Sequence, residues 1–199
     1  VIVDALKGTV LLEPDKDTTR EYQEKLAEFI KDERETNEYL DKIPLIASGE
    51  RYSVGLNIGG TAPDEAFKYV DFVGLFRTEF LYMGSDYMPS EQEQFEAYKR
   101  VLANAMGNPV TLRTLDIGGD KTLRYMALPK EDNPFLGNRA LRLCLQHMDL
   151  FKTQLRAALR ASAFGNLQIM FPMVGTMDDI RAANKVVEEV KADLREKGI

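Results

Sequence analysis

Two arginines stand where apolar runs of the sequence end. Arg77 follows the run at 71–76 within "GLFRTEFLYM", and Arg113 lies near the end of the run at 109–115. Continuous apolar runs of this length are typical of strands that are buried on both faces of a parallel sheet. The carboxyl ends of parallel strands meet at one edge of the sheet, and ligands of α/β folds bind there. We therefore predict that Arg77 and Arg113 converge on one site.

A pair of guanidinium groups is suited to a small anion of high charge. Each guanidinium presents a planar fork of donors that matches a carboxylate or a phosphate. Two acids, Glu79 and Asp116, follow the arginines closely in the sequence. Each arginine could instead be balanced internally, Arg77 by Glu79 and Arg113 by Asp116, because buried charges are normally paired. The same pairing would hold the arginines in place before a ligand arrives, so both acids are predicted as supporting residues.

A third arginine, Arg139, lies in "NPFLGNRALR" at 133–142, around the predicted start of a helix. The free backbone amides of a helix start favour anions. An arginine on a helix is more often exposed, and we prefer Arg139 to Arg142 because it follows Gly137 closely. In "DIGGDK", at 116–121, two consecutive glycines would allow either a tight turn or a close approach of the backbone to a ligand.

The remaining candidates for chemistry carry weaker signals. His147, the only histidine, is interpreted as structural or superficial, although a histidine titrates near neutrality. The lone cysteine, Cys144, cannot form an internal disulfide or a multi-thiolate metal site, which fits a reducing compartment and predicts a small buried hydrophobe. No histidines and carboxylates show a metal-ligand spacing, so no metal ligand is predicted.

The composition is that of a globular protein. Of the 199 residues, 44% are hydrophobic and 29% are charged, which is enough apolar material for a sizeable core. No stretch approaches the roughly 20 apolar residues of a membrane helix, and Asp4 and Lys7 interrupt the place of a signal peptide. We expect a cytoplasmic protein without membrane insertion. The net charge of −6 also argues against nucleic acid as a partner.

The elements that must position the arginines alternate between strands and helices, which predicts an α/β fold with right-handed crossovers. Neither the G-x-G-x-x-G spacing nor a P-loop is present, which favours a closed barrel over a doubly wound sheet. A (β/α)8 barrel needs about eight units and roughly 250 residues, so we expect about four units, or half a barrel. The predicted strands are 52–58, 71–76, 109–115 and 167–174, and the predicted helices are 63–69, 91–105, 139–146, 150–163 and 177–197.

The first part of the chain has a different character. Two short strands, 1–4 and 9–13, read as the end of a domain that begins before Val1. Residues 15–41 lack glycine and proline, and Thr18 with Glu21 predicts a capping box at the start of a long helix. Its second half is polar all round, which suits either a solvated helix or a connector between domains.

Four motifs together resemble the enzyme I family, the phosphoenolpyruvate-protein phosphotransferases of the bacterial sugar phosphotransferase system. They are "GLFRTEFLYM", "RTLDIGGDK", "NPFLGNRALR" and "LRAALRASAFGNLQIMFPMV", and their order and spacing match over essentially the whole chain. The resemblance implies the closing strands of a phosphohistidine domain at 1–14, a linker helix at 15–43, and the first half of a phosphoenolpyruvate-binding (β/α)8 barrel at 44–199.

The resemblance also implies an activity. Phosphoenolpyruvate would give its phosphoryl group to a histidine of the same protein and then to the carrier protein HPr, with Mg²⁺ as cofactor and a homodimer as the assembly. Arg77 and Arg113 would bind the phosphate and carboxylate, and Arg139 would steady the moving phosphoryl group. Asn138 stands where the family often has an aromatic residue. The phosphorylated histidine and the Mg²⁺ ligands would lie outside this chain, so it holds no catalytic residue and we expect no turnover from it alone.

Two alternatives stay open. A half sheet exposes an edge and an apolar face, so the chain could be a non-catalytic association module. Dikinases and phosphoenolpyruvate synthases share weaker versions of the motifs, so a relative of those enzymes is the other alternative.

Overall fold

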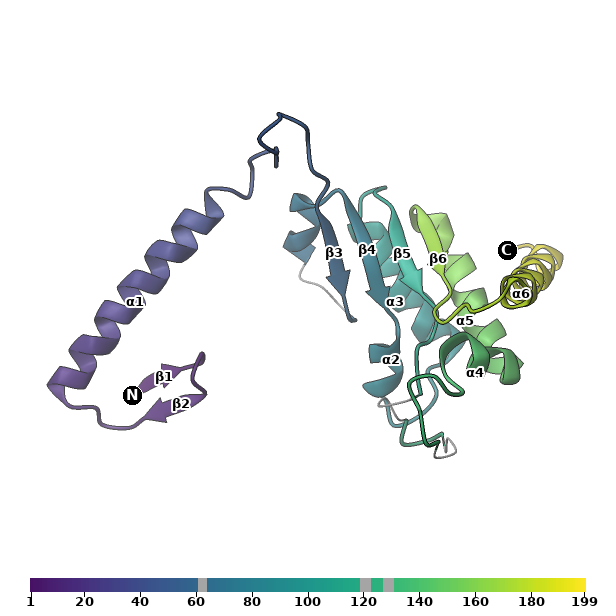
Figure 1. Cartoon of the computed structure of the whole chain (residues 1–199), viewed down its shortest axis with the longest axis horizontal. Coiled ribbons are helices and arrows are strands. Elements are labelled where there is room, and N and C mark those ends of the chain that lie inside the picture. Colours follow the sequence, from purple (N-terminus) through teal and green to yellow (C-terminus); the bar gives the residue numbers. More distant parts are fainter. Residues whose placement is uncertain (61–63, 119–122, 127–130) are drawn as a thin grey trace. The chain divides into compact units, whose positions relative to one another are not determined.

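A computed structural model describes residues 1–60, 64–118, 123–126 and 131–199 of the chain (Figure 1). The chain divides into two compact units, Val1–Tyr52 and Ser53–Ile199. Pro63 of the predicted helix 63–69, and Gly119, Asp120 and Lys121 of "DIGGDK", lie outside the described residues.

The first unit contains a hairpin and one long helix. Strands β1 (Ile2–Asp4) and β2 (Thr9–Leu11) pair antiparallel. Helix α1 (Lys16–Asn37) begins after Asp15, whose carboxylate accepts a hydrogen bond from the Thr18 amide at 2.7 Å. The predicted capping box at Thr18 and Glu21 is therefore wrong, because an aspartate three residues earlier already caps the helix.

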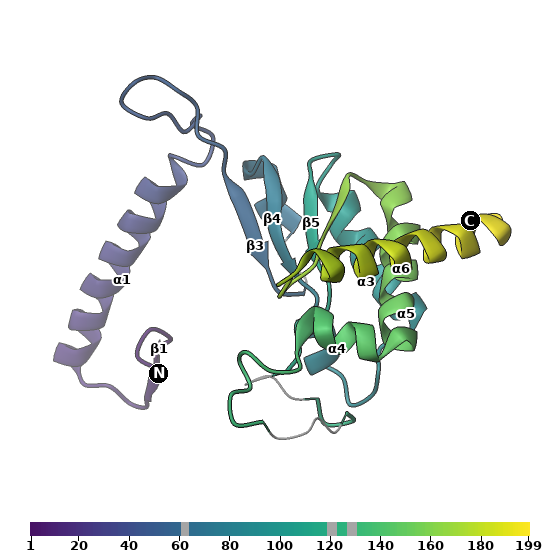
Figure 2. The same ribbon diagram turned by 45° about the vertical axis from the view of Figure 1, so that its right-hand side comes forward.

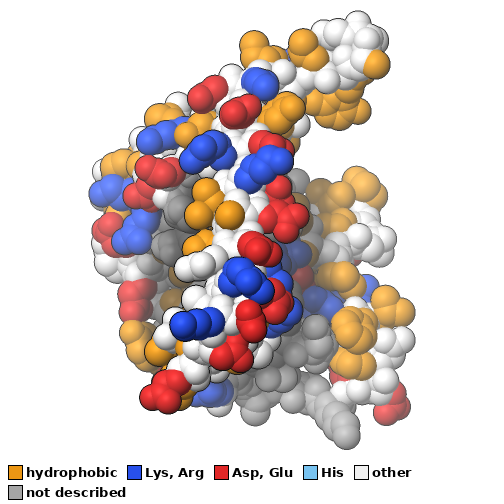
Figure 3. Space-filling view, turned by 90° about the vertical axis from the view of Figure 1, so that its left-hand side faces the viewer, with side chains coloured by type: hydrophobic (Ala, Val, Ile, Leu, Met, Phe, Trp, Pro, Cys, Tyr) orange, Lys and Arg blue, Asp and Glu red, His pale blue; other side chains and the backbone are white. Residues whose placement is uncertain are grey.

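Helix α1 is also shorter than predicted and is solvated on all sides. It ends at Asn37 instead of residue 41, and none of its residues is buried. Its apolar side chains Leu26, Phe29 and Ile30 are exposed. In Figure 3, where the left-hand side of Figure 1 faces the viewer, acidic and basic side chains are interspersed over the visible face.

The second unit is built on a parallel sheet of four strands, in the order β3-β4-β5-β6. Each strand pairs with the strand that follows it in the chain, as the α/β interpretation requires. The strands are β3 (Gly55–Ile58), β4 (Phe72–Arg77), β5 (Val110–Arg113) and β6 (Leu167–Met170). Strand β6 is shorter than the predicted 167–174, and Pro172, which has no amide hydrogen to donate, lies just beyond its end.

Helices α3 (Glu91–Asn104) and α5 (Met148–Ala161) cover one face of this sheet (Figures 1 and 2). The predicted Ser90–Glu93 capping box is confirmed at the start of α3. A continuous apolar layer fills the space between sheet and helices. Its buried members include Val73, Phe76, Val110 and Leu112 from the strands, Tyr98, Val101 and Leu102 from α3, and Ala157, Ala158 and Ala161 from α5.

The other helices complete the second unit. The segment predicted as a helix before β4 is a 3-10 helix, η1 (Asp64–Tyr69). Helix α2 (Glu79–Met83) was not predicted, because five residues are too few to show a helical period. Helix α4 (Ala140–Gln146) and helix α6 (Met177–Glu196) both pack against α5. In Figures 1 and 2, α2 and α4 lie at the end of the sheet to which the strand arrows point.

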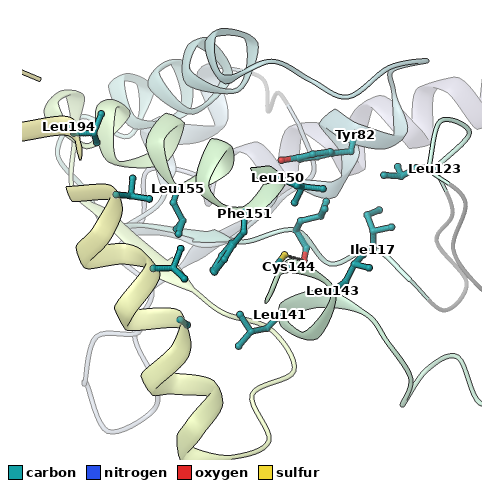
Figure 4. Packing of buried hydrophobic residues seen from close by; sticks show 14 residues of the cluster. Tyr82, Ile117, Leu123, Leu141, Leu143, Cys144, Leu150, Phe151, Leu155 and Leu194 are labelled. Atoms are coloured by element: carbon teal, nitrogen blue, oxygen red, sulfur yellow. Dashed lines mark hydrogen bonds between the residues drawn. The ribbon is translucent and has the colours of Figure 1, made fainter. Parts of the chain in front are cut away.

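A second apolar cluster joins α4, α5 and α6, and Cys144 lies inside it. Figure 4 shows the sulfur of Cys144 surrounded by apolar side chains that include Ile117, Leu143 and Phe151. The thiol is fully buried, so the prediction of a small buried hydrophobe is confirmed. Burial raises the pKa of the Cys144 thiol to about 12. Among the described residues, no helix is long and apolar enough to cross a membrane.

Cys144 should be unreactive in the folded chain. The thiolate is the nucleophile in alkylation, and the raised pKa keeps this group protonated at pH 8. Iodoacetamide should therefore modify the native chain at least about a hundredfold more slowly than the chain in denaturant, as followed by mass spectrometry. Between pH 9.0, the ordinary pKa of the thiol, and about pH 12, the folded chain keeps this proton while the unfolded chain loses it. The free energy of unfolding should therefore fall as the pH rises through that window. Equal alkylation rates in the two states would contradict the burial.

Candidate functional site at the carboxyl edge of the sheet

The structure brings Arg77 and Arg113 together at the carboxyl edge of the sheet. Each is the last residue of its strand, β4 and β5, and the two are register partners in the parallel ladder. Residues of one row in a sheet direct their side chains to the same face. Met170, the last residue of β6, continues the row beyond Arg113.

Arg113 is held between two carboxylates. Its guanidinium forms an ion pair with Glu79, which is fully buried, and a second with Asp116, where Nη1 and Oδ2 are 3.2 Å apart. The side chain of Arg113 is only 15% exposed. Burying a charge is unfavourable unless it is paired, so these three side chains fix one another. Glu79 therefore pairs with Arg113 and not with Arg77, so the alternative in which Glu79 balances Arg77 is wrong.

Asp116 extends this arrangement to Arg139. Its Oδ1 accepts hydrogen bonds from Arg139 Nη2 at 2.8 Å and from Nε at 3.3 Å. Glu79, Arg113, Asp116 and Arg139 thus form a continuous chain of alternating charge. We call these four residues the charge chain.

Arg77 is not part of the charge chain. Within the described ranges it forms no ion pair, and its buried Nε has no hydrogen-bond partner. Its guanidinium carbon lies 4.8 Å from the centre of the Phe80 ring. Arg77 therefore contacts an aromatic ring, whereas Arg113 and Arg139 contact carboxylates.

The backbone around Arg139 is tightly constrained. A Cβ added to Gly118 would lie 2.5 Å from the Cβ of Arg139, and Gly118 has a φ of +117°. One glycine of the predicted pair therefore serves close packing against Arg139. Ala140 has a φ of +54°, an unfavourable conformation for alanine, while its amide donates to the Ile117 carbonyl at 3.1 Å. Strained backbone of this kind persists only where the surroundings determine it.

The loop before Arg139 has its own supports. Both carboxylate oxygens of Glu131 accept from the Asn138 amide at 3.0 Å. The guanidinium of Arg142 donates to the carbonyls of Leu136 and Gly137 at 2.6 and 3.2 Å. Arg142 is thus exposed and braces the loop, whereas Arg139 reaches the charge chain.

A buried network of polar side chains lies next to the charge chain. Thr78 Oγ1 donates to the carbonyl of Arg113 at 2.8 Å. Gln154, from α5, donates to Thr78 Oγ1 at 3.0 Å and to the Tyr98 hydroxyl at 3.2 Å, and its oxygen accepts from the Leu115 amide at 2.8 Å. Gln154 therefore joins the ends of β4 and β5 to the helices behind them.

Sequence reasoning missed this network, although one signal was available. Gln154 is a fully buried polar residue in the apolar stripe of α5, between Phe151 and Ala158. A polar side chain in such a stripe must find partners. No comparable signal pointed to Thr78 or Phe80.

The structure also locates the weaker candidates. His147 is exposed at the junction of α4 and α5, in agreement with its interpretation as a structural or superficial residue. In the part of the chain that the structure describes, no group of three or more histidine, cysteine, aspartate or glutamate side chains could hold a metal ion. The guanidinium groups at this edge are arranged so that they could bind and orient an anion.

Comparison with known proteins agrees with this chemistry. The model of the phosphoenolpyruvate-binding domain of phosphoenolpyruvate-utilising enzymes matches residues 33–199. The chain belongs to this family. All residues of the site lie within the matched segment, so the charge chain and Arg77 are parts of a phosphoenolpyruvate-utilising domain.

The curated relatives narrow the resemblance within the family. The phosphoenolpyruvate-protein phosphotransferase of Staphylococcus carnosus (strain TM300) is 49% identical over 200 residues. Those of Priestia megaterium and Bacillus subtilis (strain 168) are 47% and 46% identical over 203 and 202 residues. Each comparison covers 100% of this chain and 35% of the relative. The resemblance to enzyme I that the four motifs predicted is confirmed.

Replacing Gln154 should destabilise the second unit. In Gln154→Leu, the Leu115 amide loses its acceptor while Thr78 and Tyr98 lose a donor, and each buried group left unsatisfied costs about 1–3 kcal/mol. Urea denaturation should show a loss in this range. Gln168→Leu is the matched control, because Gln168 is exposed on β6, and it should change the stability by less than about 0.5 kcal/mol. Equal stability of the two variants would show that the network contributes nothing.

Proposed function

We propose that this chain forms the substrate-binding part of a phosphoenolpyruvate-protein phosphotransferase. The observation that carries the proposal is the register of Arg77 with Arg113 at the carboxyl edge of the sheet, with Arg139 tied to the same place through Asp116. In the whole protein, phosphoenolpyruvate would give its phosphoryl group to a histidine and then to HPr. The names of the relatives support the reaction class.

The three arginines suit the two anionic groups of phosphoenolpyruvate. A guanidinium fork can bind a carboxylate or a phosphate through two parallel hydrogen bonds. In our proposal Arg77 and Arg113 hold the phosphate and the carboxylate, and Arg139 stabilises the phosphoryl group as it moves. Phosphoryl transfer needs mainly positioning and stabilisation of charge. The carboxylates of the charge chain fix Arg113 and Arg139 before the ligand arrives, so these side chains lose less conformational entropy when the ligand binds.

Mg²⁺ is the cofactor that this reaction class implies. When bound, it would supply positive charge that compensates the charge of the phosphate. The described residues do not fit it, because they hold no cluster of metal ligands and because Glu79 and Asp116 are engaged with arginines. The ion would need ligands other than these, and the proposed roles of the three arginines do not pass through it.

We further propose that residues 44–199 are the first half of a (β/α)8 barrel. The strand order follows the chain without the reversal that marks a doubly wound sheet, and α3 and α5 share one face. The opposite face carries the alternate positions of the strands, among them Asn57, Thr111 and Gln168, which would line the interior of a barrel. Residues 1–14 would belong to a phosphohistidine domain, and the solvated helix within 15–43 would be its linker.

The proposal extends to partners and location. Formation of a homodimer and docking of HPr would be properties of the whole protein. That protein would work in the cytoplasm, because a single cysteine without a disulfide partner is typical of a reducing compartment. A dikinase-type relative is the second candidate, and the weaker motif match disfavours it. The identities of 46–49% with phosphotransferases over the whole chain add to that preference.

Arg77→Ala should weaken the binding of phosphoenolpyruvate to the 199-residue chain. Loss of one charged bidentate contact is expected to cost about 2–5 kcal/mol, as measured by titration calorimetry. Arg195→Ala is the matched control, because Arg195 lies in the last turn of α6 and is exposed, and it should bind like the wild type. If the wild type and Arg77→Ala bound phosphoenolpyruvate with equal affinity, Arg77 would not be a binding residue.

A further inference from the structure

The three arginines of the site are held in two different ways. Arg113 and Arg139 each contact a carboxylate that is almost fully buried. Arg77 contacts none within the described residues, and the interaction that holds its guanidinium is the face of Phe80, 4.8 Å away. An aromatic ring attracts a cation through its quadrupole and leaves the positive charge in place.

Phe80 is itself held in position from the other side. A Cβ added to Gly59 would lie 2.6 Å from two carbon atoms of the Phe80 ring. Gly59 directly follows β3, while Phe80 is in α2 and Arg77 ends β4. Three neighbouring elements therefore meet at this ring, and the missing side chain at Gly59 makes room for it.

We propose that Phe80 is a positioning residue for the anion, which acts by fixing the guanidinium of Arg77 without neutralising it. The inference rests on the proposed function and adds a division of labour to it. A carboxylate in this place would compete with the ligand for the donors of Arg77. The ring orients the same group and occupies its face, so the donors at the edge of the guanidinium remain available to a phosphate or carboxylate oxygen.

Phe164 supplies a control of the same kind outside the site. Phe80 is 40% exposed and Phe164 is 44% exposed, and Lys99 Nζ lies 4.5 Å from the centre of the Phe164 ring. Phe164→Leu thus removes an equally exposed ring with a cation on its face. Any general effect of such a removal should appear in both variants.

The experiment compares phosphoenolpyruvate binding by the 199-residue chain in five forms. These are the wild type, Phe80→Leu, Phe80→Tyr, Gly59→Ala and Phe164→Leu. Calorimetry should show binding about two- to fivefold weaker in Phe80→Leu, as the loss of an exposed cation–π contact predicts. Gly59→Ala, which displaces the ring, should weaken binding in the same direction. Phe80→Tyr, which keeps a ring of the same width on the guanidinium, should retain the wild-type affinity, and Phe164→Leu should match the wild type.

A second measurement follows Arg77 directly, without a ligand. The Nε–Hε resonance of Arg77, assigned by its absence in Arg77→Lys, should carry a ring-current shift in the wild type and in Phe80→Tyr, and lose it in Phe80→Leu. An unchanged resonance in Phe80→Leu would overturn the positioning role. Unchanged affinity in Phe80→Leu, with clear binding by the wild type, would overturn the inference alone. Absence of binding by the folded wild-type chain would overturn the proposed function and the inference with it.

Discussion

The carboxylate of Glu79, which has no contact with solvent, constrains the whole carboxyl edge of the sheet. A buried carboxylate is tolerated when a cation and hydrogen bonds compensate for its lost hydration, and Arg113 supplies the cation. Because Arg113 is committed to Glu79, its other terminal nitrogen is directed to Asp116, and Asp116 in turn fixes Arg139. The positions of two of the three arginines therefore follow from the burial of one acid.

The polar layer behind the edge keeps this arrangement in register with the sheet. Gln154 hydrogen-bonds the Leu115 amide and Thr78, and Thr78 donates to the carbonyl of Arg113, so hydrogen bonds join α5 to the ends of β4 and β5. Burial raises the pKa of Tyr98, so its hydroxyl stays protonated and continues the network as a donor to Gln94. A network in which each member has partners specifies one geometry of the core, and a half-satisfied one would not.

The sequence predicted where Arg77 and Arg113 lie better than it predicted what they contact. The apolar runs before Arg77 and Arg113 predict buried parallel strands, because the change from apolar to charged residues in the sequence marks the end of such a strand. Glu79 pairs with Arg113 instead of Arg77 because it lies in the short helix α2. A helix of five residues is too short to be predicted from the periodicity of the sequence. The start of α1 was misplaced for a related reason, since both Asp15 and Thr18 can cap and only the structure selects between them.

The two ways of holding an arginine have different consequences for an anion. A guanidinium between two carboxylates is rigid, but part of its charge is already compensated. A guanidinium on an aromatic face keeps its full charge, and the donors at its edge remain available to the ligand. Arg77 and Arg113 lie in one row of the sheet, and in our proposal Arg113 fixes the geometry of the site while Arg77 attracts the anion. The ligand that we propose is a small anion with two charged groups, so each arginine would bind one of them.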